Sequence, residues 1–375
     1  MLYNREDFTV IDVALQHNEY KIKMKELVGL NKEELEKEMT AIGEKPFRAK
    51  QLWHFIYNQG MTDFDKMTTI SKPMRQFFSE NFTLKRPNVI KTQFSEDKSA
   101  KWLIELSDGK RIESVVIPED DRGAICISTQ VGCACGCQFC LTGTLKLNRN
   151  LTTKEIVEQV MVARDTYNEW QDAVEENNRV LSNIVVMGMG EPLHNYENTL
   201  KALKIIMDCD GMAISKRRIT LSTSGVADKI PSVAKDLGVK LAISLHASDN
   251  ETRNAIMPIN RKYPLPVLME ACCEYQKIRE KRSYITFEYV MLNGINDRPS
   301  NAKDLIKLMQ KYRIKAKFNL IPFNAWEGAP FQCSKEENIK KFAGILTSAG
   351  YASPIRVSRG RDIKAACGQL AAGKK

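Results

Sequence analysis

The sequence predicts an α/β fold in which six β/α units form a partial barrel, preceded by a small N-terminal helical accessory domain and a connecting β-hairpin layer. From residue 123 onward, short apolar runs rich in β-branched residues alternate with amphipathic stretches, the pattern of strands and helices in a parallel sheet. Glycine, cysteine or small polar residues follow directly after most of these runs. Parallel sheets bind ligands at the carboxyl ends of their strands, so we expect a binding site there.

Length and composition set the limits of this prediction. With 375 residues the chain can form one large domain and a smaller one. No uncharged apolar run reaches the ~18 residues of a membrane span, and the first residues lack a signal-peptide pattern, so we expect a cytoplasmic protein. In that compartment the ten cysteines are expected to be reduced thiols, metal ligands or catalysts. The net charge of +10 favours a polyanionic partner such as RNA.

Residues 1–88 are expected to form the helical accessory domain. Asn31 is a suitable cap for a helix that ends near Gly43, and Pro46 begins a second helix that extends to Gly60. Basic and aromatic residues cluster in this second helix: Lys45, Arg48, Lys50, Trp53 and His54. Such a combination is typical of a nucleic-acid contact surface. A helical domain with solvated lysines explains the same residues equally well, and both interpretations remain open.

Residues 89–122 are expected to form the β-hairpin layer. Two β-rich runs, 102–106 and 111–117, are joined by Ser107-Asp-Gly, which is a hairpin signal. Glu113 lies within the second run, where a glutamate normally faces solvent.

The barrel is expected to span residues 123–353, followed by a C-terminal segment, 354–375. Its predicted strands are 124–128, 184–187, 218–222, 240–244, 284–291 and 317–321. Its predicted helices are 153–164, 198–207, 230–237, 265–279, 302–312 and 336–348.

A cysteine loop follows the first predicted barrel strand. Cys133, Cys137 and Cys140 have the spacing C-x3-C-x2-C, which allows one tight loop to ligate three corners of a [4Fe-4S] cluster and leaves the fourth iron without a protein ligand. An iron of that kind can bind a small chelating molecule, which indicates chemistry rather than a structural site. Zinc held by four thiolates, with Cys135 as the fourth, is the alternative, although structural zinc usually takes two separated C-x2-C pairs.

The loops after the other strands carry groups suited to a polar ligand. They are Gly188-Met-Gly-Glu-Pro192, Ser222-Thr-Ser-Gly225, Ser244-Leu-His246 and Pro322-Phe-Asn324. The glycines allow close approach of the backbone, and Glu191 is suited to hold an ammonium group. Each loop alone is a weak signal, but their convergence beside three cysteines is a strong one.

At this point the sequence resembles a known family. The cysteine motif with Phe139, the Gly188-Met-Gly-Glu-Pro loop, Gln130-Val-Gly-Cys, Asn148-Arg-Asn-Leu-Thr, Ser244-Leu-His-Ala and the tail Arg359-Gly-Arg-Asp-Ile-Lys-Ala-Ala-Cys367-Gly-Gln-Leu are similar to those of the RlmN/Cfr family of radical S-adenosylmethionine RNA methyltransferases. The resemblance spans the chain from the helical module to the tail.

The resemblance implies a dual-specificity enzyme that methylates carbon 2 of an adenosine in the peptidyl-transferase region of 23S rRNA and of adenosine 37 in a subset of tRNAs. It implies two S-adenosylmethionine molecules per turnover, a methyl-cysteine intermediate and a 5′-deoxyadenosyl radical. A flavodoxin-type reductant is the expected electron donor, and a monomer is the default state. Radical chemistry suits this target because carbon 2 of adenine is electron-poor and does not attack a sulfonium methyl.

The family also implies a role for individual residues. Cys133, Cys137 and Cys140 would bind the [4Fe-4S] cluster. The residues implied to bind S-adenosylmethionine are Gly190, Glu191, Ser222, Ser244, Leu245, His246 and Asn324. Cys367 would carry the methyl group, Cys126 would form a transient disulfide with it, and Glu113 would accept the proton. Without the family, Cys126 reads as a small buried hydrophobe and Cys367 as an incidental thiol in a flexible tail.

Two alternatives remain at this stage. Cfr-like methylation of adenine carbon 8 shares the cluster and both catalytic cysteines, although Pro192 and the Thr220-Leu-Ser-Thr-Ser-Gly loop favour carbon 2. A noncatalytic, zinc-containing RNA-binding protein is the alternative from another class.

Overall fold

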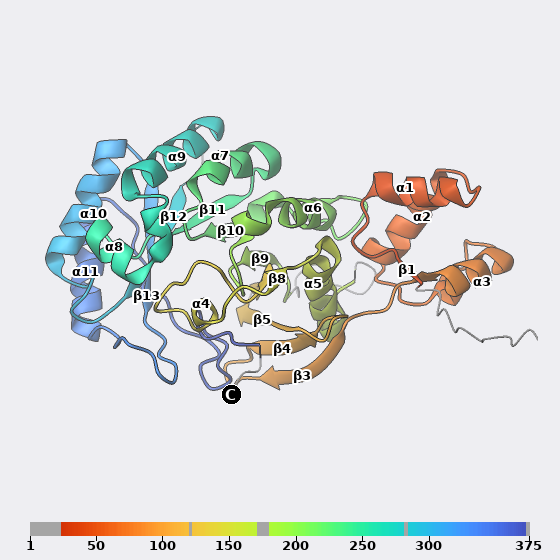
Figure 1. Cartoon of the computed structure of the whole chain (residues 1–375), viewed down its shortest axis with the longest axis horizontal. Coiled ribbons are helices and arrows are strands. Elements are labelled where there is room, and N and C mark those ends of the chain that lie inside the picture. The colour runs from red at the N-terminus through yellow and green to blue at the C-terminus, as the bar shows by residue number, and fades with distance from the viewer. Residues whose placement is uncertain (1–23, 120–121, 171–179, 281–283, 373–375) are drawn as a thin grey trace, which may run out of the picture.

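The predicted partial barrel is confirmed by a computed structural model, which describes residues 24–119, 122–170, 180–280 and 284–372 (Figure 1). Its six strands lie parallel in the order β13-β12-β11-β10-β9-β6. Their bounds are β6 Arg122–Cys126, β9 Asn183–Val186, β10 Ile219–Thr223, β11 Lys240–Ser244, β12 Ile285–Met291 and β13 Ala316–Pro322. No helix among the described residues is long and apolar enough to cross a membrane.

Helices cover the outer face of this sheet (Figure 1). The six that follow the predicted pattern are α5 Thr153–Tyr167, α6 Tyr196–Met207, α7 Ile230–Ser232, α9 Leu265–Ile278, α10 Pro299–Tyr312 and α11 Glu336–Ser348. The predicted helix 230–237 is divided, since α7 continues as a π-helix over Val233–Leu237. Two short helices were not predicted: α4 Leu141–Thr144, and α8 Asn250–Ile256, which Asp249 caps by accepting a hydrogen bond from the Thr252 backbone N–H at 2.7 Å.

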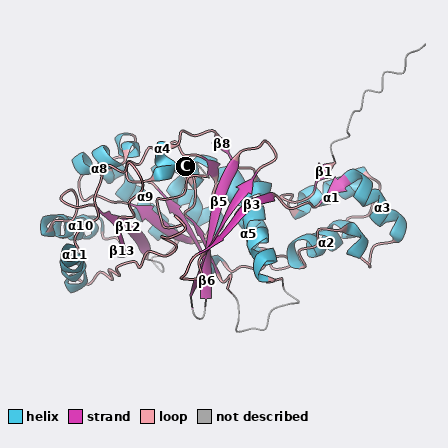
Figure 2. Ribbon diagram, turned by 90° about the horizontal axis from the view of Figure 1, so that it is seen from below, coloured by secondary structure: helices cyan, strands magenta, loops and turns pink. Residues whose placement is uncertain are grey.

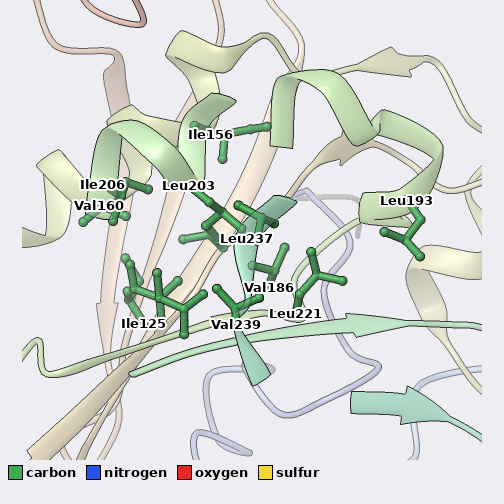
Figure 3. Packing of buried hydrophobic residues seen from close by; sticks show 14 of the residues in the cluster. Ile125, Ile156, Val160, Val186, Leu193, Leu203, Ile206, Leu221, Leu237 and Val239 are labelled. Carbon is green, nitrogen blue, oxygen red and sulfur yellow. The ribbon is translucent and has the colours of Figure 1, made fainter. Parts of the chain in front are cut away.

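The core lies between the helices and the outward-facing strand residues. Figure 3 shows this packing with Ile156 and Val160 of α5 and Leu203 and Ile206 of α6 above Ile125, Val186 and Leu221 of the strands. Because side chains alternate along a strand, the residues between these point into the barrel. Val185, Thr220 and Thr286 accordingly line its interior.

The predicted hairpin is confirmed and is part of the barrel sheet. Strands β4 Ala100–Glu105 and β5 Arg111–Glu119 pair antiparallel, and β5 pairs antiparallel with β6. A further strand, β3 Asn88–Phe94, pairs with β4. It was not predicted because its side chains are mostly exposed and lack apolar alternation.

The helical module lies at one end of the molecule (Figure 2). It contains α1 Lys32–Ala41, α2 Phe47–Trp53 with its π-helical continuation His54–Asn58, α3 Lys72–Asn81 and the short pair β1 Lys25–Glu26 and β2 Phe82–Thr83. Ion pairs join it to α5, α6 and the residues after α6: Lys154–Glu26, Lys201–Glu34, Arg86–Asp165 and Lys32–Asp208. Trp53 is buried against this junction, so the prediction that it contributes to a surface is wrong.

The C-terminal segment crosses the open side of the barrel. Residues 352–356 run along β13, where Phe318 N–H donates to Ala352 O at 2.9 Å and Arg356 N–H donates to Leu320 O at 2.7 Å. The chain then passes β4, where Lys101 Nζ donates to Lys364 O at 3.2 Å, and reaches the cysteine loop, where Leu141 N–H donates to Gly368 O at 2.7 Å (Figure 1). This path brings the last described residues to the carboxyl ends of the strands.

Candidate functional site

The three cysteines of the C-x3-C-x2-C motif line one cavity of about 180 Å³ at the carboxyl ends of the barrel strands. Desolvation raises the pKa of the Cys137 and Cys140 thiols, whereas a hydrogen bond from Cys135 lowers that of Cys133. Buried thiols of this kind become thiolates when a metal centre replaces their protons. The donor set therefore fits an iron–sulfur cluster.

The sulfur atoms of the cysteine loop do not form a group in which three ligand atoms all lie within 4.8 Å of one another. Zinc holds its thiolates at about 2.3 Å, so four zinc ligands lie close to one another. Among the described residues, the one group of three ligand atoms within 4.8 Å of one another is Asp208, Cys209 and Asp210, on the surface. Lys32 already pairs with both of these aspartates at 2.8 and 2.7 Å. No such compact group is formed by the motif cysteines.

Glycines bring the loop after β9 against the floor of the cavity. Gly190 has φ of +100°, and a Cβ there would lie 2.5 Å from the Cβ of Gln130. The loop is held by the Gln130 side chain, which accepts from the Glu191 N–H at 2.8 Å, and by Ser128 Oγ, which accepts from Met189 N–H at 2.8 Å. A backbone fixed at this distance presents its polar groups to a ligand in the cavity.

Glu191 is buried at the wall of the cavity and is largely engaged by the protein. Its Oε2 accepts from both the N–H and the hydroxyl of Ser224 at 2.7 Å, and its Oε1 accepts from Leu193 N–H at 3.0 Å. A carboxylate has about four acceptor positions, so one remains for an ammonium group. The predicted role of Glu191 is compatible with this geometry.

His246 contributes a neutral hydrogen-bond donor. Burial and the nearby Arg253 lower its pKa to about 3. Its Nδ1 accepts from Val290 N–H at 2.9 Å, so the proton of the neutral ring lies on Nε2. The Phe139 ring packs edge-on against it, with centroids 4.6 Å apart. Ser222, Ser244 and Asn324 line the same cavity.

The methyl-carrier candidate Cys367 lines this cavity as well, although it lies 227 residues after Cys140 in the sequence. Three hydrogen bonds fix the tail around it: Leu141 N–H to Gly368 O at 2.7 Å, Thr142 Oγ1 to Leu370 O at 2.7 Å, and Asn324 Nδ2 to Cys367 O at 3.2 Å. Cys367 is an exposed residue, but desolvation of its sulfur by the surrounding protein raises the pKa of the thiol, and the charge of Arg356 opposes this rise. The cysteine loop and the tail therefore form one unit.

Leu245, Cys126 and Glu113 were predicted site residues, but they lie outside the cavity lining. Leu245 is fully buried in the core, between the lining residues Ser244 and His246. Cys126 ends β6, and its pKa is raised to about 12 by burial, with a contribution from the charge of Cys367 that places the two thiols within electrostatic range. Cys126 and Cys367 are both free thiols.

Glu113 is buried rather than exposed, so the expectation of a solvent-facing side chain is wrong. Its Oε1 pairs with the buried Lys101 Nζ at 3.1 Å. Its Oε2 accepts from the N–H groups of Ala371 and Ala372 at 2.7 and 3.0 Å. The carboxylate therefore holds the tail that carries Cys367.

Sequence reasoning missed two residues that shape the site. Arg253 is fully buried on α8, a helix too short to show a clear period, and no local signal marks it. Glu288 lies on β12 and faces the barrel interior. A glutamate in the middle of the apolar run Ile285–Met291 was the signal that could have identified it.

Arg253 joins two of the site loops, those after β10 and β11. Its Nη2 donates to Ser224 O at 2.7 Å and Ser244 O at 3.1 Å, and its Nε donates to Leu245 O at 3.1 Å.

Arg253→Met leaves these buried carbonyls unpaired, so we expect a loss of about 3 kcal/mol or more of unfolding free energy. Chemical denaturation of the purified protein measures it. The exposed Arg261 is the matched control, and Arg261→Met should change stability by about 0.5 kcal/mol or less. Equal stability of the two variants would contradict the bridging role.

Comparisons with known proteins show which family the chain resembles. Residues 25–84 match the family described as the ribosomal RNA large subunit methyltransferase N-terminal domain, and residues 127–306 match the radical SAM superfamily. The chain is 56% identical to the dual-specificity RNA methyltransferase RlmN of Rhodospirillum rubrum, over 92% of this chain and 79% of that protein. It is 55% identical to the RlmN of Gluconobacter oxydans, over 92% of this chain and 85% of that protein.

A solved structure is similar over almost the whole chain. The crystal structure of a radical SAM methyltransferase from Sphaerobacter thermophilus superposes with a TM-score of 0.86 at 40% identity, covering 93% of this chain and 99% of that one.

Proposed function

The chain belongs to the RlmN family of radical S-adenosylmethionine RNA methyltransferases, and from this premise we propose that it methylates carbon 2 of adenosine in 23S rRNA and tRNA. The targets would be one adenosine in the peptidyl-transferase region and adenosine 37 of a subset of tRNAs. The observation that carries the proposal is that Cys367, from the far end of the chain, lines the same cavity as Cys133, Cys137 and Cys140.

The cofactor assignments follow the lining of that cavity. Cys133, Cys137 and Cys140 would hold a [4Fe-4S] cluster, which when bound supplies the electron that splits S-adenosylmethionine into methionine and a 5′-deoxyadenosyl radical. The groups that would hold S-adenosylmethionine are the backbone at Gly190 and Leu245 and the side chains of Glu191, Ser222, Ser244, His246 and Asn324. Glu191 has an acceptor position for the ammonium group, and His246 has a donor for a carboxylate or hydroxyl.

Cys367 would act as the methyl carrier. Its thiolate would take the methyl group of one S-adenosylmethionine, and S-adenosylhomocysteine would leave. The new S-methyl group would then give a hydrogen atom to the 5′-deoxyadenosyl radical, and its carbon would bond to carbon 2 of adenine, which links RNA to protein. The adduct would lose one electron, which returns to the cluster, and the proton on carbon 2, which Glu113 takes. The Cys126 thiolate would attack the Cys367 sulfur and break the carbon–sulfur bond; the released carbon keeps the electron pair and takes up a proton to become the methyl group, and a Cys126–Cys367 disulfide remains.

Glu113 keeps room for this proton while it holds the tail. Its Oε2 accepts from the N–H groups of Ala371 and Ala372, and its Oε1 pairs with Lys101 Nζ. A carboxylate has about four acceptor positions, so one remains for the proton of carbon 2.

Cys126→Ala is expected to trap the enzyme on its substrate. Without the attacking thiol, the bond between Cys367 and the RNA methyl carbon persists after the carbon–carbon bond has formed. A nuclease-sensitive band of higher mass on a denaturing gel should contain most of the reacted enzyme. Cys272→Ala is the matched control, because Cys272 is also a buried thiol but lies on α9. Free, fully methylated RNA from the Cys126 variant would disprove its role in release.

RNA binding is expected to weaken as salt rises. The module exposes Lys45, Phe47 and Lys50 on α2 and its entry, and the whole chain has a net charge of +10. Counterion release makes affinity for RNA fall with salt concentration, by roughly tenfold or more between 50 and 200 mM for several phosphate contacts. Filter binding of tRNA to wild type and to Lys45→Gln/Lys50→Gln tests this. A shallower fall of RNA affinity with salt concentration in the variant would support an RNA contact at these lysines. The same fall in both proteins would show that this surface does not contact RNA.

The position of the methyl group on adenine distinguishes the proposed carbon-2 activity from the alternative carbon-8 activity. Modified RNA is digested to nucleosides, and mass spectrometry with standards identifies the isomer. The expected product is 2-methyladenosine, and 8-methyladenosine alone would place the chain with the carbon-8 enzymes.

We also propose the division of the chain and its partners as the family implies them. The helical RNA-binding domain would span 1–88, the hairpin layer 89–122, the barrel 123–353 and the carrier segment 354–375. The match to the N-terminal domain family ends at residue 84, and the match to the radical SAM superfamily begins at residue 127. These limits support the boundaries proposed at the two ends of the hairpin layer. A flavodoxin-type donor would supply electrons, and the chain would act as a monomer.

A further inference from the structure

A second cavity lies inside the barrel. It has a volume of about 570 Å³, within the roughly 300–1,000 Å³ of small-molecule sites. Several residues line both this cavity and the one beside the cysteine loop: Met187, Glu288, Ile321, Asn324, Arg356 and Cys367. The methyl-carrier thiol therefore stands between the proposed cofactor site and a second space of sufficient size for a nucleobase.

Two polar residues face this space from neighbouring strands. Glu288 of β12 and Asn319 of β13 are direct partners in the strand register, and Asn319 Nδ2 donates to Glu288 Oε2 at 2.7 Å. Glu288 is buried, with 7% of its surface exposed. Burying a carboxyl group inside an apolar strand is costly, and the roles proposed above leave this one unused. A ligand with a hydrogen-bond donor would offset the cost.

The mouth of the cavity carries positive charge. Its exposed lining consists of Lys317 on β13 and the segment 354–359, which includes Arg356 and Arg359. Val357 is 74% exposed on the same segment. Cations around an opening are suited to the phosphates of an RNA strand, and an apolar side chain there is suited to contact a base. An RNA nucleotide is therefore a better match than a free small anion, because the interior of the cavity presents a carboxyl group.

The hydrogen-bonding groups of adenine complement those of Glu288 and Asn319. Its Watson–Crick edge has an amino donor at N6 beside an acceptor at N1, and carbon 2 is bonded to N1. We propose that Glu288 accepts a hydrogen bond from the N6 amino group of adenine, and that Asn319 donates its second Nδ2 hydrogen to N1. The two residues would in this way select adenine and orient its carbon 2 toward Cys367. This inference rests on the proposed methylation of adenine, and it adds the residues that recognise the base.

Guanine and hypoxanthine carry the opposite pattern on that edge. Both have an oxygen acceptor at position 6 and a hydrogen on N1. Facing Glu288, the oxygen would meet a group that accepts, and buried polar groups without partners cause strong rejection, of 10⁴ or more in favourable sites. Glu288→Gln supplies an amide that can donate to the oxygen. The variant should therefore lose discrimination between adenine and hypoxanthine.

The test uses short RNA substrates with adenosine or inosine at the target position. Single-turnover methylation is measured for full-length, cluster-loaded wild type, Glu288→Gln and Asn319→Ser. Each rate is divided by the fraction of enzyme that carries methyl-Cys367, measured by protein mass spectrometry. The ratio of the adenosine rate to the inosine rate then does not depend on how much of a variant is folded or binds its cofactors. Glu158→Gln is the matched control, because Glu158 is equally buried but lies on α5, outside the barrel.

Wild type and Glu158→Gln should prefer adenosine by ~100-fold or more, and both site variants should narrow this preference at least ~10-fold. Asn319 is only partly buried, so its variant gives a second result if Glu288→Gln does not fold. An unchanged adenosine preference in either folded variant would overturn the inference. If wild type itself methylates neither RNA, the proposed function fails, and this outcome is distinct from failure of base recognition.

Discussion

Cys367→Ala is expected to abolish RNA methylation, by roughly 10³-fold or more, because no other thiol stands between the two cavities in the described structure. The variant keeps Cys133, Cys137 and Cys140, so its iron content and reductive cleavage of S-adenosylmethionine should persist. Methyl transfer to RNA is measured with S-adenosylmethionine labelled on its methyl group. The protein itself should remain unlabelled.

Cys333→Ala is the control for Cys367→Ala. Cys333 is also exposed, but it lies after β13 and lines neither cavity. It should methylate RNA at the rate of wild type. Methylated RNA from the Cys367 variant would show that the methyl group reaches adenine by a direct route.

Cys137→Ala should remove most of the bound iron and reduce 5′-deoxyadenosine formation below detection. Three thiolates hold the cluster in the proposed site, and loss of one leaves a second iron without a protein ligand. Cys135→Ala is the matched control in the same loop, because Cys135 lines the same cavity but lies outside the C-x3-C-x2-C spacing. Iron and sulfide are assayed after anaerobic reconstitution. Equal iron loss in the two variants would favour a four-thiolate site instead.

The barrel could be predicted because its signal is local. Buried parallel strands require continuous apolar runs, and the helices between them require one apolar face, so both patterns are visible in single segments. The cysteine loop and the Gly188–Pro192 loop could also be predicted, since their residues are close in the sequence. Strand β3 could not, because an exposed edge strand needs no apolar alternation.

The remaining parts of the site depend on contacts between distant segments. The place of Glu113 under the tail results from hydrogen bonds across 258 and 259 residues, which no local pattern reports. Arg253 binds three carbonyl groups in two loops and has no motif of its own. Trp53 beside lysines left two interpretations open, an RNA contact surface or a plain helical domain, and its burial excludes it from the surface.

The stoichiometry of the reaction tests the central claim most directly. Reconstituted wild-type protein is given S-adenosylmethionine, a one-electron reductant and RNA under anaerobic conditions, and 5′-deoxyadenosine and 2-methyladenosine are quantified together by mass spectrometry. The account predicts one molecule of 5′-deoxyadenosine for each 2-methyladenosine, and neither product without the reductant. Formation of 2-methyladenosine without 5′-deoxyadenosine would contradict it.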